Sequence, residues 1–281
     1  MRGHGSSIQS VKFEFIYNLS KKESVSGSFF FGERMAVRNI RLLVAYDGTG
    51  YHGWQRQKNG LAIQAVIEEC LQVMTQSPVK LLASGRTDAG VHALNQVCNF
   101  KTPSQISVDA LRRGLNALLP SDILIRNAVA VPLDFHSRYQ AKSKIYEYRI
   151  LNRPDPDIFR RNVLWHVRFP LRVEKMSECL TLLEGTHDFS TFKSSGSANR
   201  NPVRNILKAA MVKDEDGVLR TVIEGNGFLR HMVRNIMGTL VEVGSGRMDV
   251  KSFEKVLESR DRRLAGRKAP PQGLFLMEVK Y

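Results

Sequence analysis

The chain has only three cysteines in 281 residues, and Cys70, Cys98 and Cys179 are far apart in the sequence. No CxxC spacing occurs, which argues against a disulfide framework or a zinc site and fits a reducing, cytoplasmic environment. The seven histidines contain no HExxH or HxH pair, so the sequence gives no case for a bound metal. No stretch approaches the roughly 18 uninterrupted apolar residues of a membrane-spanning helix, and we therefore expect no membrane partner.

Acidic residues are few relative to basic ones: 27 Asp and Glu stand against 42 Lys and Arg, which gives a formal net charge of +15. The excess is spread along the chain, so we expect folded surfaces rather than one tail to carry it. Such surfaces suit a long, structured anion such as RNA. A soluble basic protein without an anionic partner is the simpler alternative. Hydrophobic residues make up 42% of the chain, which is enough for a large core in one domain or two packed halves.

Residues 1–34 are rich in Ser and Gly, and we predict a disordered N-terminal extension there. The apolar run Phe29–Phe31 is too short for a signal peptide, whose apolar region needs about 7–15 residues. Met35 directly precedes the first regular pattern and could be the natural start. A regulatory or targeting arm is the alternative interpretation.

From residue 38 onward the apolar pattern becomes regular and predicts an α+β fold. We expect two βαββ-like halves, residues 35–135 and 136–281. A mainly antiparallel sheet would have its helices packed on one side, with an RNA-binding cleft between the halves. Expected strands lie near 40–46, 79–84, 95–101, 123–131, 143–151, 163–169 and 274–280, with a hairpin near 204–224; expected helices lie near 63–74, 107–118, 173–184, 229–243 and 250–258.

Gly48, Gly50 and Gly53 form a GxGxxG pattern directly after the first predicted strand. In a dinucleotide-binding fold the helix begins within such glycines, so that its N-terminus faces the pyrophosphate. Here residues 54–60 come between the glycines and the next predicted helix. Over a nicotinamide site we therefore favour a flexible loop that stacks on bases and touches phosphates. Its candidate contacts are Tyr51, His52, Trp54, Gln55 and Arg56.

The segment Ser84–Ala93 follows another apolar strand and holds a cation and an anion two residues apart, Arg86 and Asp88, between Gly85 and Gly90. The glycines would let the backbone approach a ligand, while the two charged side chains point to one side. In the alternative interpretation, Asp88 only forms a turn by bonding its own backbone.

This segment resembles the signature of the TruA-type tRNA pseudouridine synthases, and further matching segments follow in the same order. Together they span roughly residues 37–281, and residues 1–34 have no counterpart in the family pattern. The matching segments are Tyr46–Gln55, Gly85–Ala93, Phe135–Arg138, Lys144–Tyr148, Arg200–Arg204, Gly227–Asn235 and Ala269–Leu274.

The resemblance implies an isomerase that converts uridine to pseudouridine at positions 38, 39 and 40 of the tRNA anticodon stem-loop, as a homodimer and without a cofactor. Breaking the N1–C1′ bond, turning the uracil and rejoining it through C5 changes neither oxidation state nor net proton count. Asp88 matches the family's catalytic aspartate. It could add to C1′, add to C6 or remove a proton from C2′, and the sequence leaves all three routes open.

By the same resemblance, Arg234 pairs with the catalytic aspartate, and a nearby guanidinium stabilises the ionised carboxylate. From the residues alone, Arg230, His231, Arg234 and Asn235 form the polar face of a helix, which could equally be solvated. Tyr146 matches the family's active-site tyrosine, expected to lie against the uracil and to assist removal of the C5 proton. Without the family, it would be taken for a packing residue in a strand.

A uridine inside a stem must be flipped out to meet a carboxylate, and we expect Arg86 to fill the space it leaves or to steady the backbone. His52 and Trp54 are further substrate-binding candidates. Residues 260–268 could also be a solvated basic loop. The candidate phosphate contacts are Arg200, Arg204, Arg230, Arg260, Arg262, Arg263, Arg267 and Lys268.

A noncatalytic RNA-binding module with RRM-like βαββ halves is the rival hypothesis, because its sheets and charge would look alike. Asp88 discriminates between the two, since a carboxylate in an anion-binding cleft repels phosphate and gives a pure binder no advantage.

Overall fold

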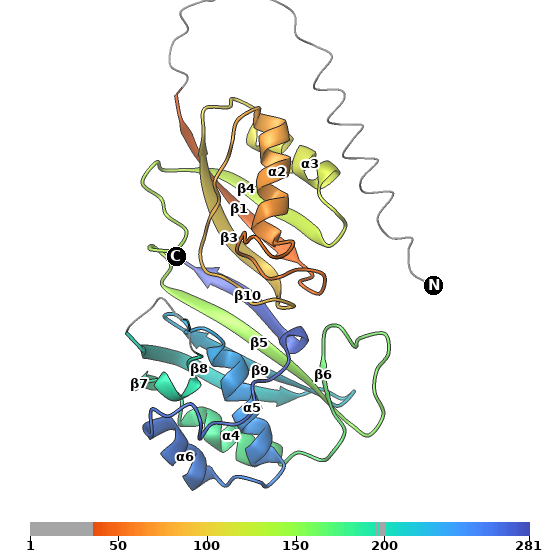
Figure 1. Cartoon of the computed structure of the whole chain (residues 1–281), viewed down its shortest axis with the longest axis vertical. Helices are drawn as coiled ribbons and strands as arrows, with labels where there is room; N and C mark the ends of the chain where they lie inside the picture. The colour runs from red at the N-terminus through yellow and green to blue at the C-terminus, as the bar shows by residue number, and fades with distance from the viewer. Residues whose placement is uncertain (1–35, 195, 197–200) are drawn as a thin grey trace, which may run out of the picture. The chain divides into compact units, whose positions relative to one another are not determined.

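The computed structural model describes residues 36–194, 196 and 201–281 (Figure 1). The extension predicted for residues 1–34, the possible start at Met35 and the phosphate candidate Arg200 lie outside the described residues. Residues 37–281 form one compact unit.

A single sheet of ten strands runs through this unit, with the order β4-β1-β3-β10-β5-β9-β8-β7 and with β2 and β6 attached to β3 and β5. Its pairs are antiparallel except for β10 with β3 and β5 with β6. The coarse part of the α+β prediction, helices together with a mainly antiparallel sheet, is therefore confirmed. The strands are β1 (Arg38–Tyr46), β2 (Leu82–Ala83), β3 (His92–Thr102), β4 (Ile123–Val131), β5 (Ser143–Asn152), β6 (Trp165–Val167), β7 (Gly185–Asp188), β8 (Val203–Lys213), β9 (Val218–Gly225) and β10 (Leu274–Lys280).

The last strand of the chain lies in the middle of the sheet, between the strands of residues 35–135 and those of residues 136–281 (Figure 1). Phe275 and Leu276 of β10 pair in parallel with β3, and Leu274 pairs with Tyr148 of β5 on the other side. The C-terminal strand thus joins the strands of both predicted halves into one sheet.

Figure 1 shows α2 and α3 alongside β1, β3 and β4. It shows α4, α5 and α6 alongside the strands of residues 136–281. Two helices begin with a side-chain cap, which satisfies a free N–H of the first turn: Ser107 accepts from Ala110, and Asp249 accepts from Ser252. The helices are α2 (Ile63–Thr75), α3 (Val108–Leu118), α4 (Val173–Thr181), α5 (Met232–Gly244) and α6 (Val250–Glu258). Among the helices described, none is long and apolar enough to cross a membrane.

Several predicted boundaries were wrong for local reasons. The strand expected near 79–84 is reduced to the two residues of β2, and the helix expected near 173–184 ends at Thr181 because β7 begins at Gly185. The helix expected from residue 229 starts at Met232, since His231 has a left-handed backbone with φ of 62°.

The three cysteines are buried in the core. Burial raises the pKa of Cys70 to about 11 and that of Cys179 to about 12. These thiols therefore stay protonated at neutral pH, as is typical of core cysteines rather than nucleophiles.

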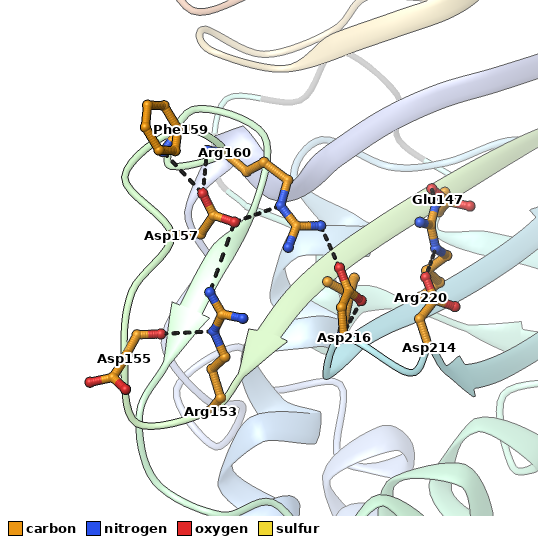
Figure 2. A network of polar contacts seen from close by, with 10 residues as sticks. Glu147, Arg153, Asp155, Asp157, Phe159, Arg160, Asp214, Asp216 and Arg220 are labelled. Atoms are coloured by element: carbon orange, nitrogen blue, oxygen red, sulfur yellow. Dashed lines mark hydrogen bonds and ion pairs between the residues drawn. The ribbon is translucent and has the colours of Figure 1, made fainter.

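Ion pairs fix the segment between β5 and β6 against the β8–β9 turn (Figure 2). Asp157 accepts from the backbone N–H groups of Phe159 and Arg160 and from Arg160 Nε at 2.7 Å. The same guanidinium donates to Asp216 Oδ2 at 2.6 Å, in the turn between β8 and β9. The pKa of Asp157 is lowered chiefly by its side-chain hydrogen bond with Arg160.

Candidate active site

The loop that carries Asp88 follows β2 and is held by backbone hydrogen bonds on both sides. Ser84 N–H donates to Val97 of β3 at 2.8 Å, and Gln96 Nε2 donates to the carbonyl of Gly85 at 3.1 Å. After the loop, Val91 N–H returns to the Asp88 carbonyl at 3.1 Å. These bonds fix the backbone, while the Asp88 side chain remains 26% exposed.

The glycine-rich segment 47–54 supports this loop from beneath. Trp54 N–H donates to the Thr87 carbonyl at 3.1 Å, and the hydroxyls of Tyr46 and Thr87 are hydrogen-bonded at 2.7 Å. Gly53 has φ of +87°, and a Cβ there would lie 2.5 Å from Thr87 O. Glycine is required at this position because both the backbone conformation and the close approach exclude a side chain.

The interpretation of 51–56 as an RNA-contacting loop needs correction for most of its side chains. Trp54 is only 1% exposed and packs against the Tyr46 ring, with ring centroids 5.9 Å apart, so it is not available to stack on a base. Tyr51 is 5% exposed and donates to Asp122, and Arg56 pairs with Glu68 at 2.9 Å. Of this group, His52 and Arg56 lie exposed at the surface, and the pairing of Arg56 with Glu68 leaves about half of its side chain accessible.

Arg234, on the first turn of α5, contacts Asp88. Its Nη1 lies 3.2 Å from Asp88 Oδ2, and its side chain is 8% exposed. Arg234 Nε donates to the Ala269 carbonyl at 2.8 Å, while Ala269 N–H donates to the Arg234 carbonyl at 3.0 Å. The arginine is therefore fixed at both ends. It does not lie on a solvated polar face, because α5 is buried almost all round.

His231 is the second group beside the carboxylate, and sequence analysis assigned it no role. Its Nε2 lies 3.5 Å from Asp88 Oδ1, while its Nδ1 is buried and has no hydrogen-bond partner in the described structure. Burial lowers the pKa of His231 and outweighs the opposing influence of Asp88. The neutral ring with its proton on Nε2 can donate toward the carboxylate. The left-handed backbone at His231 is a strained conformation of the kind that gathers at functional sites.

Tyr146 of β5 completes the group. It is 8% exposed and meets Phe228 edge to face, with ring centroids 5.0 Å apart. Burial raises the pKa of Tyr146 far above its ordinary value, and the nearby Tyr46 and Asp88 raise it further. The phenol is therefore neutral at physiological pH, which makes it a hydrogen-bond donor or a packing surface rather than a base.

Arg86, Arg204 and Arg230 are placed around this group in different ways. Arg86 is exposed and donates to Gln55 Oε1 at 2.9 Å. Arg204, half-buried at the start of β8, donates to the Asn201 carbonyl at 3.0 Å. Arg230 is exposed in the turn before α5.

The basic segment 260–268 serves partly to build the site. Arg262 donates to Asn235 Oδ1 at 3.1 Å and to the Ala265 carbonyl at 3.2 Å, which makes it a support of α5. Arg263 is 89% exposed and pairs with Asp261. Lys268 lies near Asp88 and Arg234, and its pKa is lowered first by burial and then by Arg234.

A metal or dinucleotide site finds no support in the described residues. No group of three His, Cys, Asp or Glu side chains there could hold a metal ion. The glycines of 48–53 contact protein backbone, with a Cβ on Gly48 lying 2.1 Å from Val91 O. The next helix starts only at Ile63, so no helix N-terminus faces these glycines as a pyrophosphate would need.

Gly238 of α5 allows the loop behind Arg234 to approach, and we expect Gly238→Ala to loosen the site. A Cβ there would lie 1.6 Å from Arg267 O, so residues 267–269 must shift, and with them the carbonyl that holds Arg234. We expect a loss of about 2–3 kcal/mol in unfolding free energy and at least a tenfold fall in turnover, measured by urea unfolding and by product formation.

Gly50→Ala is the matched control, because nothing lies within 4 Å of its Cβ position. It should change the unfolding free energy by less than about 0.5 kcal/mol. Equal behaviour of the two variants would contradict the role given to Gly238.

The site thus combines a partly exposed carboxylate, a buried arginine that contacts it and further cations nearby. Such a site suits an enzyme that acts on a polyanion. A family model described as tRNA pseudouridine synthase matches residues 42–140 and 180–281. The chain belongs to the tRNA pseudouridine synthase family, a family of isomerases.

Relatives matched over their whole length agree with this assignment. A tRNA pseudouridine synthase A of Thermoanaerobacter sp. (strain X514) is 45% identical over 245 residues, which are 87% of this chain and 100% of the relative. The tRNA pseudouridine synthase A of Geotalea uraniireducens (strain Rf4) is 47% identical with the same coverage. Among solved structures, a dye-decolorizing protein from V. cholerae aligns over 78% of this chain and 89% of that protein's chain at 12% identity. The TM-score of 0.22 is too low to indicate a shared fold.

Proposed function

We propose that this protein isomerises uridine to pseudouridine at positions 38, 39 and 40 of the tRNA anticodon stem-loop, with Asp88 as the catalytic carboxylate and without a cofactor. The observation that carries the proposal is the contact of Asp88 with Arg234, at 3.2 Å, within segments that match the family pattern. Each of the three chemical routes uses the carboxylate itself, and the contact with the guanidinium fixes where that carboxylate lies.

The residues around Asp88 have different proposed roles. Arg234 donates to one carboxylate oxygen and His231 lies 3.5 Å from the other, so Arg234 orients the side chain while a quarter of it remains accessible. Tyr146 offers an apolar face and a neutral phenol for a uracil. Because burial keeps that phenol protonated, we propose that Tyr146 positions the base and leaves removal of the C5 proton to another group.

The target nucleotide must leave the helical stack, which costs a few kcal/mol. Arg86 lies exposed two residues before Asp88 and is bonded to Gln55 by only one of its nitrogens in the described structure. We propose that its remaining donors meet the RNA where the nucleotide leaves the stack. Exposed His52 and Arg230 are the further contacts that we propose on this surface.

The protein's working form is proposed to be a cytoplasmic homodimer. Buried, protonated cysteines without disulfide partners fit a reducing compartment. Sedimentation velocity at micromolar concentration tests the dimer: a species of twice the chain mass of 31.8 kDa is expected, and a monomer throughout would contradict it.

The reaction is tested by incubating the full chain with an unmodified tRNA transcript and mapping pseudouridine along it. We expect product at the uridines among positions 38, 39 and 40. A transcript with cytidine at all three positions is the matched control and should gain none. A transcript that carries uridines at these positions and stays unmodified would contradict the proposal.

A noncatalytic RNA-binding module would bind the same transcript and leave it unchanged. Asp88 favours the enzyme, because its carboxylate stands accessible among cations that would otherwise attract phosphate directly.

A further inference from the structure

Three cations, Arg138, Lys144 and Arg204, come together beside the start of the Asp88 loop. Lys144 lies two residues before Tyr146 on β5, so both side chains point to the same face of the sheet. A methyl group placed on Gly85 would lie 3.6 Å from Lys144 Cε and 3.7 Å from its Nζ. The ammonium group is therefore next to the backbone that leads to Asp88.

The second cation, Arg204, lies on β8, two strands away from Lys144 on β5, with β9 paired between them. Lys144 pairs with Gly225 of β9, and Gly225 pairs with Ile206 of β8, two residues after Arg204. The absence of a side chain at Gly227 leaves space beside Arg204, because a Cβ there would lie 3.6 Å from Arg204 Nε.

Arg138 comes from the segment between β4 and β5, which is tied to the body of the sheet. The neighbouring Ser137 N–H donates to Asn99 Oδ1 at 3.0 Å. Tyr281 donates its hydroxyl proton to the Ser137 carbonyl at 2.7 Å. Arg138 N–H is bonded to His136 Nδ1 at 3.1 Å. The backbone that presents Arg138 is thus fixed on both sides.

No carboxylate balances these charges. Within the described part of the chain, the Lys144 side chain makes no hydrogen bond and no ion pair, and the charged groups that act on it are Arg138 and Arg204. Burial first, and then these two guanidiniums, lower the pKa of Lys144 to about 8. Lys280 on the neighbouring β10 shows the contrast, since it binds both oxygens of Glu224 at 2.9 and 3.0 Å.

We propose that Arg138, Lys144 and Arg204 bind one backbone phosphate of the RNA, adjacent to the nucleotide that is presented to Asp88. This inference rests on the proposed function and deepens it. A phosphate offers anionic oxygens to an ammonium and two guanidiniums for which the described residues provide no carboxylate, and charge-assisted bonds of this kind are the strong ones. The site would hold the RNA strand beside Gly85, which lies three residues before the catalytic Asp88.

The first test compares Lys144→Gln with Lys213→Gln, a control that removes the same charge from the far end of β8. The measured quantities are the Kd for an unmodified tRNA transcript and its dependence on salt. Lys144→Gln should weaken binding about tenfold or more and reduce the log–log salt slope by roughly 0.7–0.9. Lys213→Gln should stay within about twofold of the wild type. Equal Kd values and slopes for wild type and Lys144→Gln would overturn the proposal.

The second test locates the phosphate and separates it from free inorganic phosphate. Anticodon stem-loop RNAs with one neutral methylphosphonate each are bound to the wild type and to Lys144→Gln. At one linkage the wild type should lose affinity while the variant loses none further. If instead 10 mM inorganic phosphate abolishes the difference in Kd between wild type and Lys144→Gln and no single methylphosphonate does, the site takes the free ion and the proposal is wrong.

The pH dependence of the Kd gives a third readout, because the guanidinium of Lys144→Arg stays charged at a pH where the Lys144 side chain is neutral. A lysine with a pKa near 8 becomes neutral as the pH rises from 7 to 9, whereas the guanidiniums of Arg138 and Arg204 do not titrate. Wild-type affinity should therefore fall over this range, and that of Lys144→Arg should not. Parallel curves would contradict the role of Lys144.

Failure of this site and failure of the proposed function are distinguishable. If the wild type binds tRNA but forms no pseudouridine, the proposed function fails while the binding comparison still stands. If the wild type forms pseudouridine and Lys144→Gln binds as tightly as Lys213→Gln, only the phosphate site fails.

Discussion

Asp88→Asn is expected to lower kcat by about 10⁴-fold or more while leaving tRNA affinity and thermal stability close to those of the wild type. The amide has nearly the shape of the carboxylate, and its single oxygen can still accept from Arg234 Nη1, which lies 3.2 Å from Asp88 Oδ2 in the wild type. It can act neither as a nucleophile nor as a base, so each of the three routes through Asp88 stops.

Turnover is measured under single-turnover conditions, and Kd by filter binding with the same transcript. Asp134→Asn, at an exposed aspartate outside the site, is the matched control and should keep wild-type turnover. Mass spectrometry of the Asp88→Asn protein excludes reversion by deamidation. Substantial turnover by the intact amide would remove Asp88 from the catalytic role.

Arg234→Ala is expected to be the most destabilising single change in the site, by about 3 kcal/mol. The guanidinium is 8% exposed and holds both Asp88 and the Ala269 carbonyl, so its loss leaves two acceptors unpaired. The estimate is at the lower end of the range for buried pairs because Asp88, at 26% exposed, can still meet water. Activity should fall as well, because the carboxylate loses the guanidinium that orients it.

A double-mutant cycle with Asp88→Ala measures the pairing itself. Asp88→Ala alone leaves a buried guanidinium without its anion, and the double variant removes both charges. We expect the double variant to be more stable than the sum of the single effects by about 1–3 kcal/mol, measured by urea unfolding. Additive effects would show that the two side chains do not stabilise one another.

The strands that follow a regular apolar alternation could be predicted from the sequence. β4 and β10 were expected at 123–131 and 274–280, and the structure has them at Ile123–Val131 and Leu274–Lys280. Alternation is a local signal, because successive side chains point to opposite faces of a strand. The pairing of β10 between β3 and β5 was not predictable in the same way, since it joins residues about 180 positions apart.

The site was predictable from its motifs but not from its packing. Asp88 and Arg234 were expected to meet, and the structure places them 3.2 Å apart. His231 was missed, although its place three residues before Arg234 was a signal that could have found it. No local pattern announces a left-handed backbone at a histidine, and that conformation delays the start of the helix to Met232 and turns the ring toward Asp88.

Trp54 shows why an aromatic residue in a glycine-rich loop misleads. A base-stacking residue and a core residue have the same side chain, and only the neighbours differ. Here the loop folds beneath residues 85–91, because Gly53 admits the Thr87 carbonyl at close range, and the indole becomes part of the core. That close approach depends on the whole tertiary fold, so the sequence around Trp54 could not reveal it.

The most direct test of the central claim is the release of tritium from tRNA that carries [5-³H]uridine, measured side by side for the wild type and Asp88→Asn. Rejoining the uracil through C5 expels the hydrogen at that carbon. We predict that the wild type releases tritium in an amount equal to the number of uridines among positions 38, 39 and 40, and that Asp88→Asn releases none in the same time. Release by both proteins at equal rates, or by neither, would contradict the account.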